Sequence, residues 1–179
     1  MITLNASDIF NKQLAHSLGL DQYAKIMRGD PTDSIFQRSF NYYYRIRRNN
    51  DWRKNYYGLF PIAKNEHWSF EQIITELYKK TGNIECSFSS KMLATIDADK
   101  PIWDQYVLKN LGFTLTGKTQ MEKLENAMTV YSQIEEWYTS YLETEEAREN
   151  IIVFDRILSD YTWLSRTKKI DCLLWGKRD

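Results

Sequence analysis

An aspartate at the start of a short helix is the residue of this chain whose type and position most directly point to chemistry. Asp104 follows Pro101, Ile102 and Trp103, and the apolar positions after it predict a short helix closed by Gly112. The helix dipole favours the charged form of a carboxylate at this end, so Asp104 can serve as an anionic group towards a substrate. Aspartate is also a common N-cap, and Pro-x-x-Asp is common in turns. The sequence leaves both roles open.

A basic stretch interleaved with aromatic residues is the second candidate for function. Between Phe36 and Tyr57 the chain carries six lysines and arginines but only one acidic residue, Asp51. Cations contact phosphates and aromatic rings stack on bases, so this stretch is typical of a nucleic-acid-binding surface. An amphipathic helix followed by a solvated turn explains the same pattern. The candidate phosphate-contacting residues are Arg45, Arg48, Arg53 and Lys54, with Tyr42, Trp52, Tyr56 and Tyr57 available for stacking.

Composition limits the classes of protein to which this chain can belong. The 179 residues fit one domain, 1–179, whose core is large enough to hold the fold without disulfides or a bound metal. The formal net charge of zero argues against a polyanion binder that works through bulk charge, so local charge matters more. Cys86 and Cys172 lack the spacing of metal ligands, and we expect no metal or cofactor. The start of the chain lacks the features of a signal peptide and no run is long enough to span a bilayer, which predicts a cytoplasmic protein.

The apolar spacing predicts an all-α fold, a compact set of helices. From Ser34 to about Arg48 aromatic residues recur every three or four positions, the pattern of a helix facing a core. Arg38, Tyr42 and Arg45 fall on the other face of this helix. Arg47 falls in line with the aromatic residues, so it either lies past the helix end or is buried and needs an acidic partner.

Capping signals place the other helices. Capping boxes at 69–72 and 119–122 predict helix starts, and Gly82 predicts the end of the first of these helices. A tight connection at 81–85 then leads into another apolar helix. A further helix is predicted over 145–161, whereas the segment 168–175 is ambiguous between a helix and a short strand.

The segment from about residue 80 to residue 111 resembles the core of helix-hairpin-helix DNA glycosylases. Gly82 lies between two helices, Asp104 ends a Pro-hydrophobic-x-Asp turn, and Val107 comes three positions later. The resemblance implies a helix-hairpin-helix element that binds phosphates of duplex DNA. It also implies that Asp104 is the catalytic carboxylate, which steadies the oxocarbenium-like sugar or activates water as a flipped base departs. The hairpin residues that would contact DNA are Lys80, Thr81, Gly82 and Asn83.

The position of the lyase lysine of this family is occupied here by Glu85 or Cys86, neither of which is an amine. The resemblance therefore implies a monofunctional N-glycosylase acting on modified bases, in a DNA-repair role. The hairpin keeps one glycine and lacks the usual proline. One alternative is a non-catalytic relative that binds nucleic acid. Another is a structural or regulatory helical module whose exposed aromatic residues contact a protein partner.

Overall fold

The computed structural model describes residues 2–12 and 18–177, and these residues form an all-α structure, as the sequence predicts. The chain divides into two compact units. Unit 1 comprises Met1–Leu18 and Asp97–Asp179, and unit 2 comprises Gly19–Ile96. The division does not say how the two units join, so the single domain expected over 1–179 stays a prediction. Within the described ranges, no helix combines the length and apolar character needed to cross a membrane.

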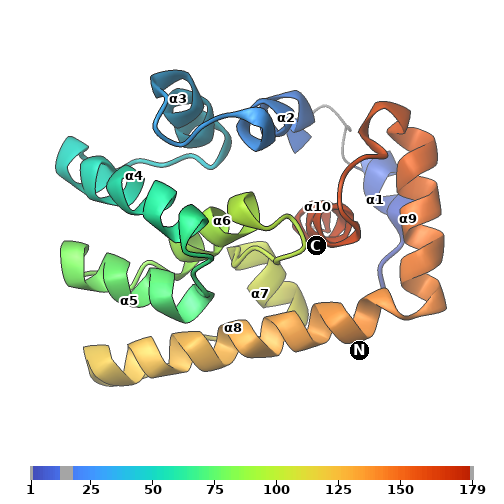
Figure 1. Cartoon of the computed structure of the whole chain (residues 1–179). Coiled ribbons are helices and arrows are strands. Elements are labelled where there is room, and N and C mark those ends of the chain that lie inside the picture. The colour runs from blue at the N-terminus through green and yellow to red at the C-terminus, as the bar shows by residue number, and fades with distance from the viewer. Residues whose placement is uncertain (1, 13–17, 178–179) are drawn as a thin grey trace. The chain divides into compact units, whose positions relative to one another are not determined.

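Unit 2 is built around the aromatic side chains of two consecutive helices, α3 and α4. Phe40 of α3 is fully buried, and its ring centroid lies 5.6 Å from that of Phe60 and 5.9 Å from that of Tyr56 on α4. Helices α4 and α5 lie side by side, and α6 packs on α5 (Figure 1). The helices of unit 2 are α2 (Leu20–Arg28), α3 (Ser34–Tyr43), α4 (Asn50–Asn65), α5 (Phe70–Thr81) and α6 (Cys86–Ile96).

Helix α3 is shorter than the predicted helix, which ran to about Arg48. The backbone N–H of Ile46 donates to the carbonyl of Asn41 (2.9 Å), the closing hydrogen bond of a Schellman motif. Arg45 occupies the left-handed position of this motif with φ 53°, where glycine is usually found. Arg47 therefore lies past the helix end and is exposed. Of the two alternatives for Arg47, the first is correct.

The helix starts predicted from capping boxes are confirmed. The Ser69 side chain accepts from the N–H of Gln72, whose own side chain accepts from the N–H of Ser69, at the head of α5. Thr119 and Glu122 make the same reciprocal pair at the head of α8. Gly82 ends α5 with φ 70°, also as predicted. These ends are found from sequence because the bonds that form them are local.

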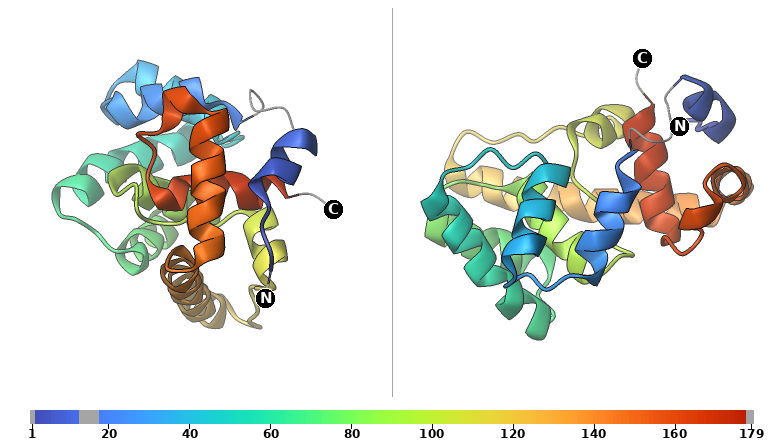
Figure 2. Two further views of the ribbon diagram at one scale, coloured as in Figure 1. Left: turned by 90° about the vertical axis from the view of Figure 1, so that its right-hand side faces the viewer. Right: turned by 90° about the horizontal axis from the view of Figure 1, so that it is seen from above.

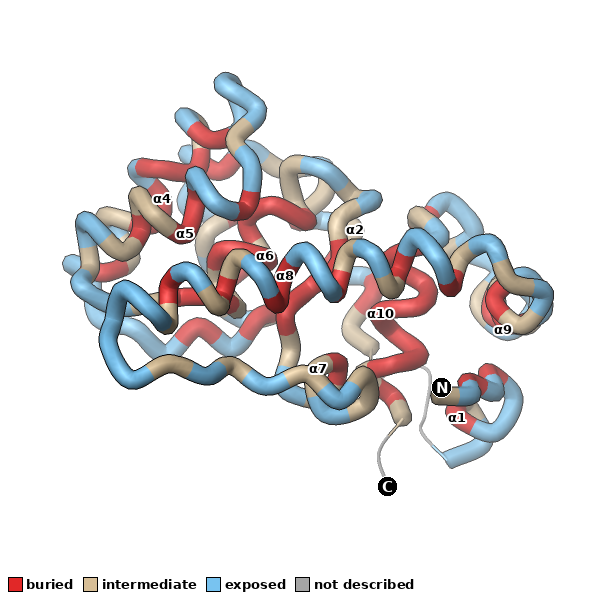
Figure 3. The backbone as a smooth tube through the Cα atoms, turned by 90° about the horizontal axis from the view of Figure 1, so that it is seen from below, coloured by how far each residue is buried: buried red, intermediate tan, exposed pale blue. Residues whose placement is uncertain are grey.

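Unit 1 is organised around α10, which is buried along almost its whole length (Figure 3). It packs against α1, α7, α8 and α9, and α1 lies beside both α9 and α10 (Figure 2). The ambiguous segment 168–175 is part of this helix. A helix buried all round lacks a polar face, so its sequence carries no clear period. The elements of unit 1 are α1 (Ala6–Lys12), α7 (Gln105–Leu111), α8 (Gln120–Leu142), α9 (Glu145–Ile157), the short 3-10 helix η2 (Ser159–Tyr161) and α10 (Arg166–Gly176).

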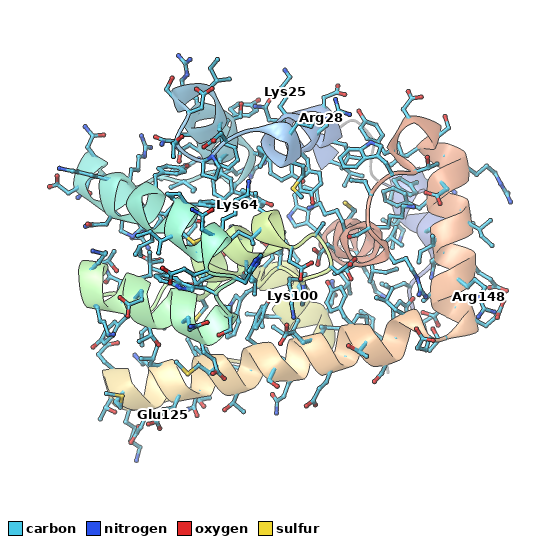
Figure 4. All side chains as sticks on the ribbon, in the orientation of Figure 1. Lys25, Arg28, Lys64, Lys100, Glu125 and Arg148 are labelled. Atoms are coloured by element: carbon cyan, nitrogen blue, oxygen red, sulfur yellow. The ribbon has the colours of Figure 1, made fainter. Side chains whose placement is uncertain are left out.

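Helix α9 ends earlier than the predicted span of 145–161. Leu158 leaves the helical region with φ −119° and ψ 60°, and η2 follows as a separate turn. The outward side of α9 is polar near its start, where Arg148 Nη1 lies 2.5 Å from Glu145 Oε2 (Figure 4). The apolar spacing of α9 continues past Leu158 into η2, so the sequence gives no sign that the helix ends there. The predicted end at residue 161 was therefore wrong.

Helix α10 carries charged side chains into the core of unit 1, and each has a partner there. Lys169 Nζ lies 2.7 Å from Asp155 Oδ1. Asp171 Oδ1 accepts from the Tyr138 hydroxyl and from the N–H of Ile102 (3.5 Å). Burial raises the pKa of Asp171 from 3.8 to about 6. The Asp171 carboxyl group therefore binds its proton more tightly in the folded chain than in the unfolded chain.

We expect Asp171 to make unit 1 less stable as the pH rises from about 4 to about 6. The folded chain holds the Asp171 proton more tightly than the unfolded chain, so the stabilisation is complete below the unfolded pKa and is lost as pH rises through the folded pKa. The loss reaches about 1.4 kcal/mol per pH unit. Urea unfolding followed by circular dichroism at several pH values measures it.

Asp171→Asn should flatten this pH dependence, because the amide does not titrate. Asp160→Asn is the matched control, since Asp160 is exposed on η2. An Asp171→Asn variant whose stability falls with pH as steeply as the wild type would contradict the assignment.

Candidate nucleic-acid interface

The segment that leads to Asp104 is anchored within unit 1 through its backbone. The Tyr131 hydroxyl on α8 donates to the carbonyl of Pro101 (2.9 Å). The next residue, Ile102, donates its N–H to the buried carboxylate of Asp171 on α10. Two helices thus hold the chain where it enters α7, and Asp104 lies half-buried at this point.

Asp104 is the N-cap of α7. Its Oδ1 accepts from the N–H of Tyr106 at 2.9 Å, and its backbone is extended, with φ −124° and ψ 150°. Gly112 ends the helix in the left-handed region, as predicted. The structural role that the sequence offered for Asp104 is therefore present. The catalytic role stays a prediction.

The residues predicted as a DNA-binding hairpin form the end of α5 and the turn after it. Thr81 Oγ1 donates to the carbonyl of Leu77 (2.7 Å) and accepts from the N–H of Asn83 (3.2 Å). The N–H of Gly82 donates to the carbonyl of Tyr78 (2.8 Å). These N–H groups already have acceptors within the turn. Phosphate binding by Lys80, Thr81, Gly82 and Asn83 stays a prediction.

Glu85 follows this turn and is the buried acid of unit 2, with 5% of its surface exposed. Both of its carboxylate oxygens lie 2.9 Å from Arg48 Nη2, and the Trp52 indole N–H donates to Oε1 at 2.9 Å. The Arg48 guanidinium also lies over the rings of Trp52 (5.7 Å) and Phe88 (5.5 Å). The contacts of Glu85 thus join the 81–85 connection to the start of α4, two stretches that are not linked by any pattern in the sequence.

The local sequence pattern does not indicate Glu85 as the partner of Arg48, because the two residues are 37 positions apart. Glu85 also directly precedes α6, whose first turn closes with the N–H of Ser89 on the Glu85 carbonyl (2.8 Å). A carboxylate at this helix start repels a phosphate, although its charge is offset by Arg48.

The four cations predicted after α3 fall into two groups. Arg48 is bound to Glu85, and Arg53 is half-buried and donates to the carbonyl of Ile46 (3.1 Å). Arg45 and Lys54 are exposed, and neither makes an ion pair with any residue that the structure describes. The second group is available to a ligand, whereas the first group holds unit 2 together.

The outward side of α3 completes this surface. We call Ile35, Arg38, Tyr42 and the following Arg45 the α3 outer face. Tyr42 has 80% of its surface exposed, and the predicted exposure of Arg38 and Tyr42 is confirmed. The other tyrosines and the tryptophan predicted to stack, Tyr56, Tyr57 and Trp52, are buried. Sequence could not rank these rings, because all of them lie among cations and only packing separates them.

The two units differ in charge. The sequence of unit 2 holds twelve lysines and arginines against eight acidic residues, whereas the rest of the chain holds twelve against sixteen. Lys25 on α2 and Lys64 on α4 are further exposed cations of unit 2 (Figure 4). The neutral total therefore conceals one basic unit and one acidic unit. Among the described residues, no group of histidine, cysteine and acidic side chains could hold a metal ion.

Replacement of Arg48 should destabilise unit 2. Arg48→Ala leaves the Glu85 carboxylate buried without its cation, which should lower the free energy of unfolding by about 1–3 kcal/mol. Arg47→Ala is the matched control, because Arg47 is exposed and should change stability by less than about 0.5 kcal/mol. Urea unfolding measures both values. Equal effects of the two substitutions would show that the ion pair carries no stability.

The two roles of Asp104 can be separated by one pair of substitutions. Asparagine caps helices as well as aspartate, so Asp104→Asn should leave the melting temperature almost unchanged. Asp104→Ala removes the cap and should cost about 1 kcal/mol. The catalytic role predicts that Asp104→Asn abolishes release of a modified base from duplex DNA, measured by strand cleavage at the abasic product. Normal base release by Asp104→Asn would end that assignment.

Comparisons of the chain with protein-family models, curated proteins and solved structures found no match. The likeness to helix-hairpin-helix DNA glycosylases over about residues 80–111 therefore stays a prediction. What the chain can bind has to be inferred from the residues of the two units themselves.

Proposed function

We propose that unit 2 binds DNA through the α3 outer face and the loop that follows it. The observation that carries this proposal is the position of Tyr42, an exposed ring with Arg38 one turn before it and Arg45 just after the helix. Helix α3 itself contains no acidic residue. Cations beside an exposed aromatic ring match the phosphates and bases of a nucleic acid.

The backbone at Arg45 supports a role beyond folding. A residue other than glycine in the left-handed region costs about 1 kcal/mol or more, and the Schellman motif asks for no side chain here. Arg45 is exposed and makes no ion pair within the described residues, so no ion pair inside unit 2 offsets this cost. A cation kept at a strained position is consistent with a ligand that needs it.

The loop after α3 extends the same basic surface. Arg47 is exposed in this loop and Lys54 is exposed in the second turn of α4. Each phosphate contact releases counterions, so a small number of such cations gives binding that depends steeply on salt. The overall neutrality of the chain does not oppose this, because unit 2 is basic by itself.

Base excision by Asp104 is a separate proposal, which rests on the resemblance and on unit 1. DNA binding by unit 2 does not require it. A module that binds a protein partner through Tyr42 is the remaining alternative, and it predicts no salt-dependent affinity for DNA.

Loss of two cations from the α3 outer face should weaken DNA binding without loss of stability. In fluorescence anisotropy with labelled DNA, the double variant Arg38→Ala, Arg45→Gly should bind more weakly. The slope of log affinity against log salt should decrease by about one for each lost contact. Arg45→Gly should also raise the free energy of unfolding by up to about 1 kcal/mol, because glycine relieves the left-handed backbone.

Arg156→Ala is the matched control, since Arg156 is an exposed arginine on α9 in unit 1. It should leave both affinity and salt slope unchanged. Absence of binding to single-stranded and duplex DNA at low salt would overturn the proposal, as would equal loss of affinity in the control.

A further inference from the structure

Tyr42 differs from the aromatic residues around it in having no place in the core. Its neighbour Tyr44 is buried, and the Tyr44 ring centroid lies 4.7 Å from that of Phe40. No ring contact or hydrogen bond within the described residues involves the Tyr42 side chain, which is 80% exposed. Most of the Tyr42 surface is therefore available to a planar group.

The helix that carries Tyr42 is held firmly in unit 2. The Asp33 side chain caps its start by accepting from the N–H of Ile35 (2.8 Å), and the Schellman motif at Arg45 closes its end. Its inner face packs through Phe36 and Phe40 against α4. The exposed ring therefore stands on a fixed support, which lowers the entropy lost when a ligand stacks on it.

The residues around Tyr42 determine which planar group fits. Arg38 lies about 6 Å before it along the helix axis, one turn away on the same side. Arg45 follows at the helix end, and Ile35 is 62% exposed on the same face one turn before Arg38. The α3 outer face thus offers a stacking surface between two cations, with apolar surface beside it. A base flanked by two phosphates has the matching order of groups.

We infer that the ligand of the α3 outer face is a single strand, one of whose unpaired bases stacks on Tyr42 while Arg38 and Arg45 contact the flanking phosphates. This inference rests on the proposed DNA binding and specifies its substrate. In a duplex each base face is covered by the next base pair, so Tyr42 has nothing to stack on and only the phosphate contacts remain. Unpaired bases expose their faces and accept an aromatic ring without regard to sequence.

The charge of this surface favours a nucleic acid over an apolar protein surface as the occupant. Neither α3 nor the loop from Arg45 to Asn49 contains an acidic residue, and Arg38, Arg45 and Arg47 all remain exposed without an ion pair among the described residues. An apolar protein partner would have to cover these three cations and leave them without counter-charges. A phosphate backbone supplies those counter-charges.

The test compares a labelled single-stranded DNA oligonucleotide of mixed sequence with the duplex formed by annealing its complement. The full-length protein should bind the single strand more tightly at the same salt concentration. Tyr42→Ala should weaken single-strand binding roughly tenfold and leave duplex binding unchanged, because the lost stacking exists only in the first complex. Tyr42→Phe keeps the ring and should bind as the wild type does.

Met121→Ala serves as the control, because Met121 is a large exposed apolar residue of unit 1 (61%). It should not alter either affinity. Circular dichroism melting checks that the Tyr42 variants fold, which is expected because Tyr42 is 80% exposed.

Failure of the inference is distinguishable from failure of the proposed DNA binding. If duplex and single strand bind equally well and Tyr42→Ala changes neither affinity, the inference is overturned, although the proposed DNA binding stands. If neither binds at low salt, both are overturned. Equal weakening of both complexes by Tyr42→Ala also overturns the inference, since it would mean that Tyr42 does not read unpaired bases.

Discussion

The left-handed turn at Arg45 is the constraint on which unit 2 depends. It ends α3 and sends the chain back, so that Phe40 of α3 can meet the aromatic residues of α4. It also separates the cations that follow. Arg47 remains outside, whereas Arg48 reaches the buried carboxylate of Glu85. A continuous helix to Arg48 would have placed Arg47 on the aromatic side, where a charge needs a partner.

Unit 2 uses its arginines in two ways. Arg48 and Arg53 satisfy groups inside the unit, one a carboxylate and the other a backbone carbonyl. Arg38, Arg45 and Arg47 are exposed, and it is these residues that make the surface basic. A basic stretch in a sequence is therefore not equivalent to a basic surface. A buried acid can pair with one of its cations, and that cation is then no longer available to a ligand.

In unit 1, too, charged side chains are used inside the core. Helix α10 brings Lys169 and Asp171 inside, where Asp155 and Tyr138 are their partners. These bonds fix the backbone that leads to Asp104, since Asp171 also accepts from Ile102. Burial of Asp171 disfavours its charged form, which raises its pKa to about 6.

The sequence by itself determined the all-α class, the capping boxes at Ser69 and Thr119, the glycine ends at Gly82 and Gly112, and the N-cap alternative for Asp104. All of these depend on residues within one or two turns of each other. Only the tertiary structure decided which rings are exposed, where α3 ends, that 168–175 is helical, and that Arg48 is bound to Glu85. These features depend on burial and on partners distant in the chain, which a local pattern does not record.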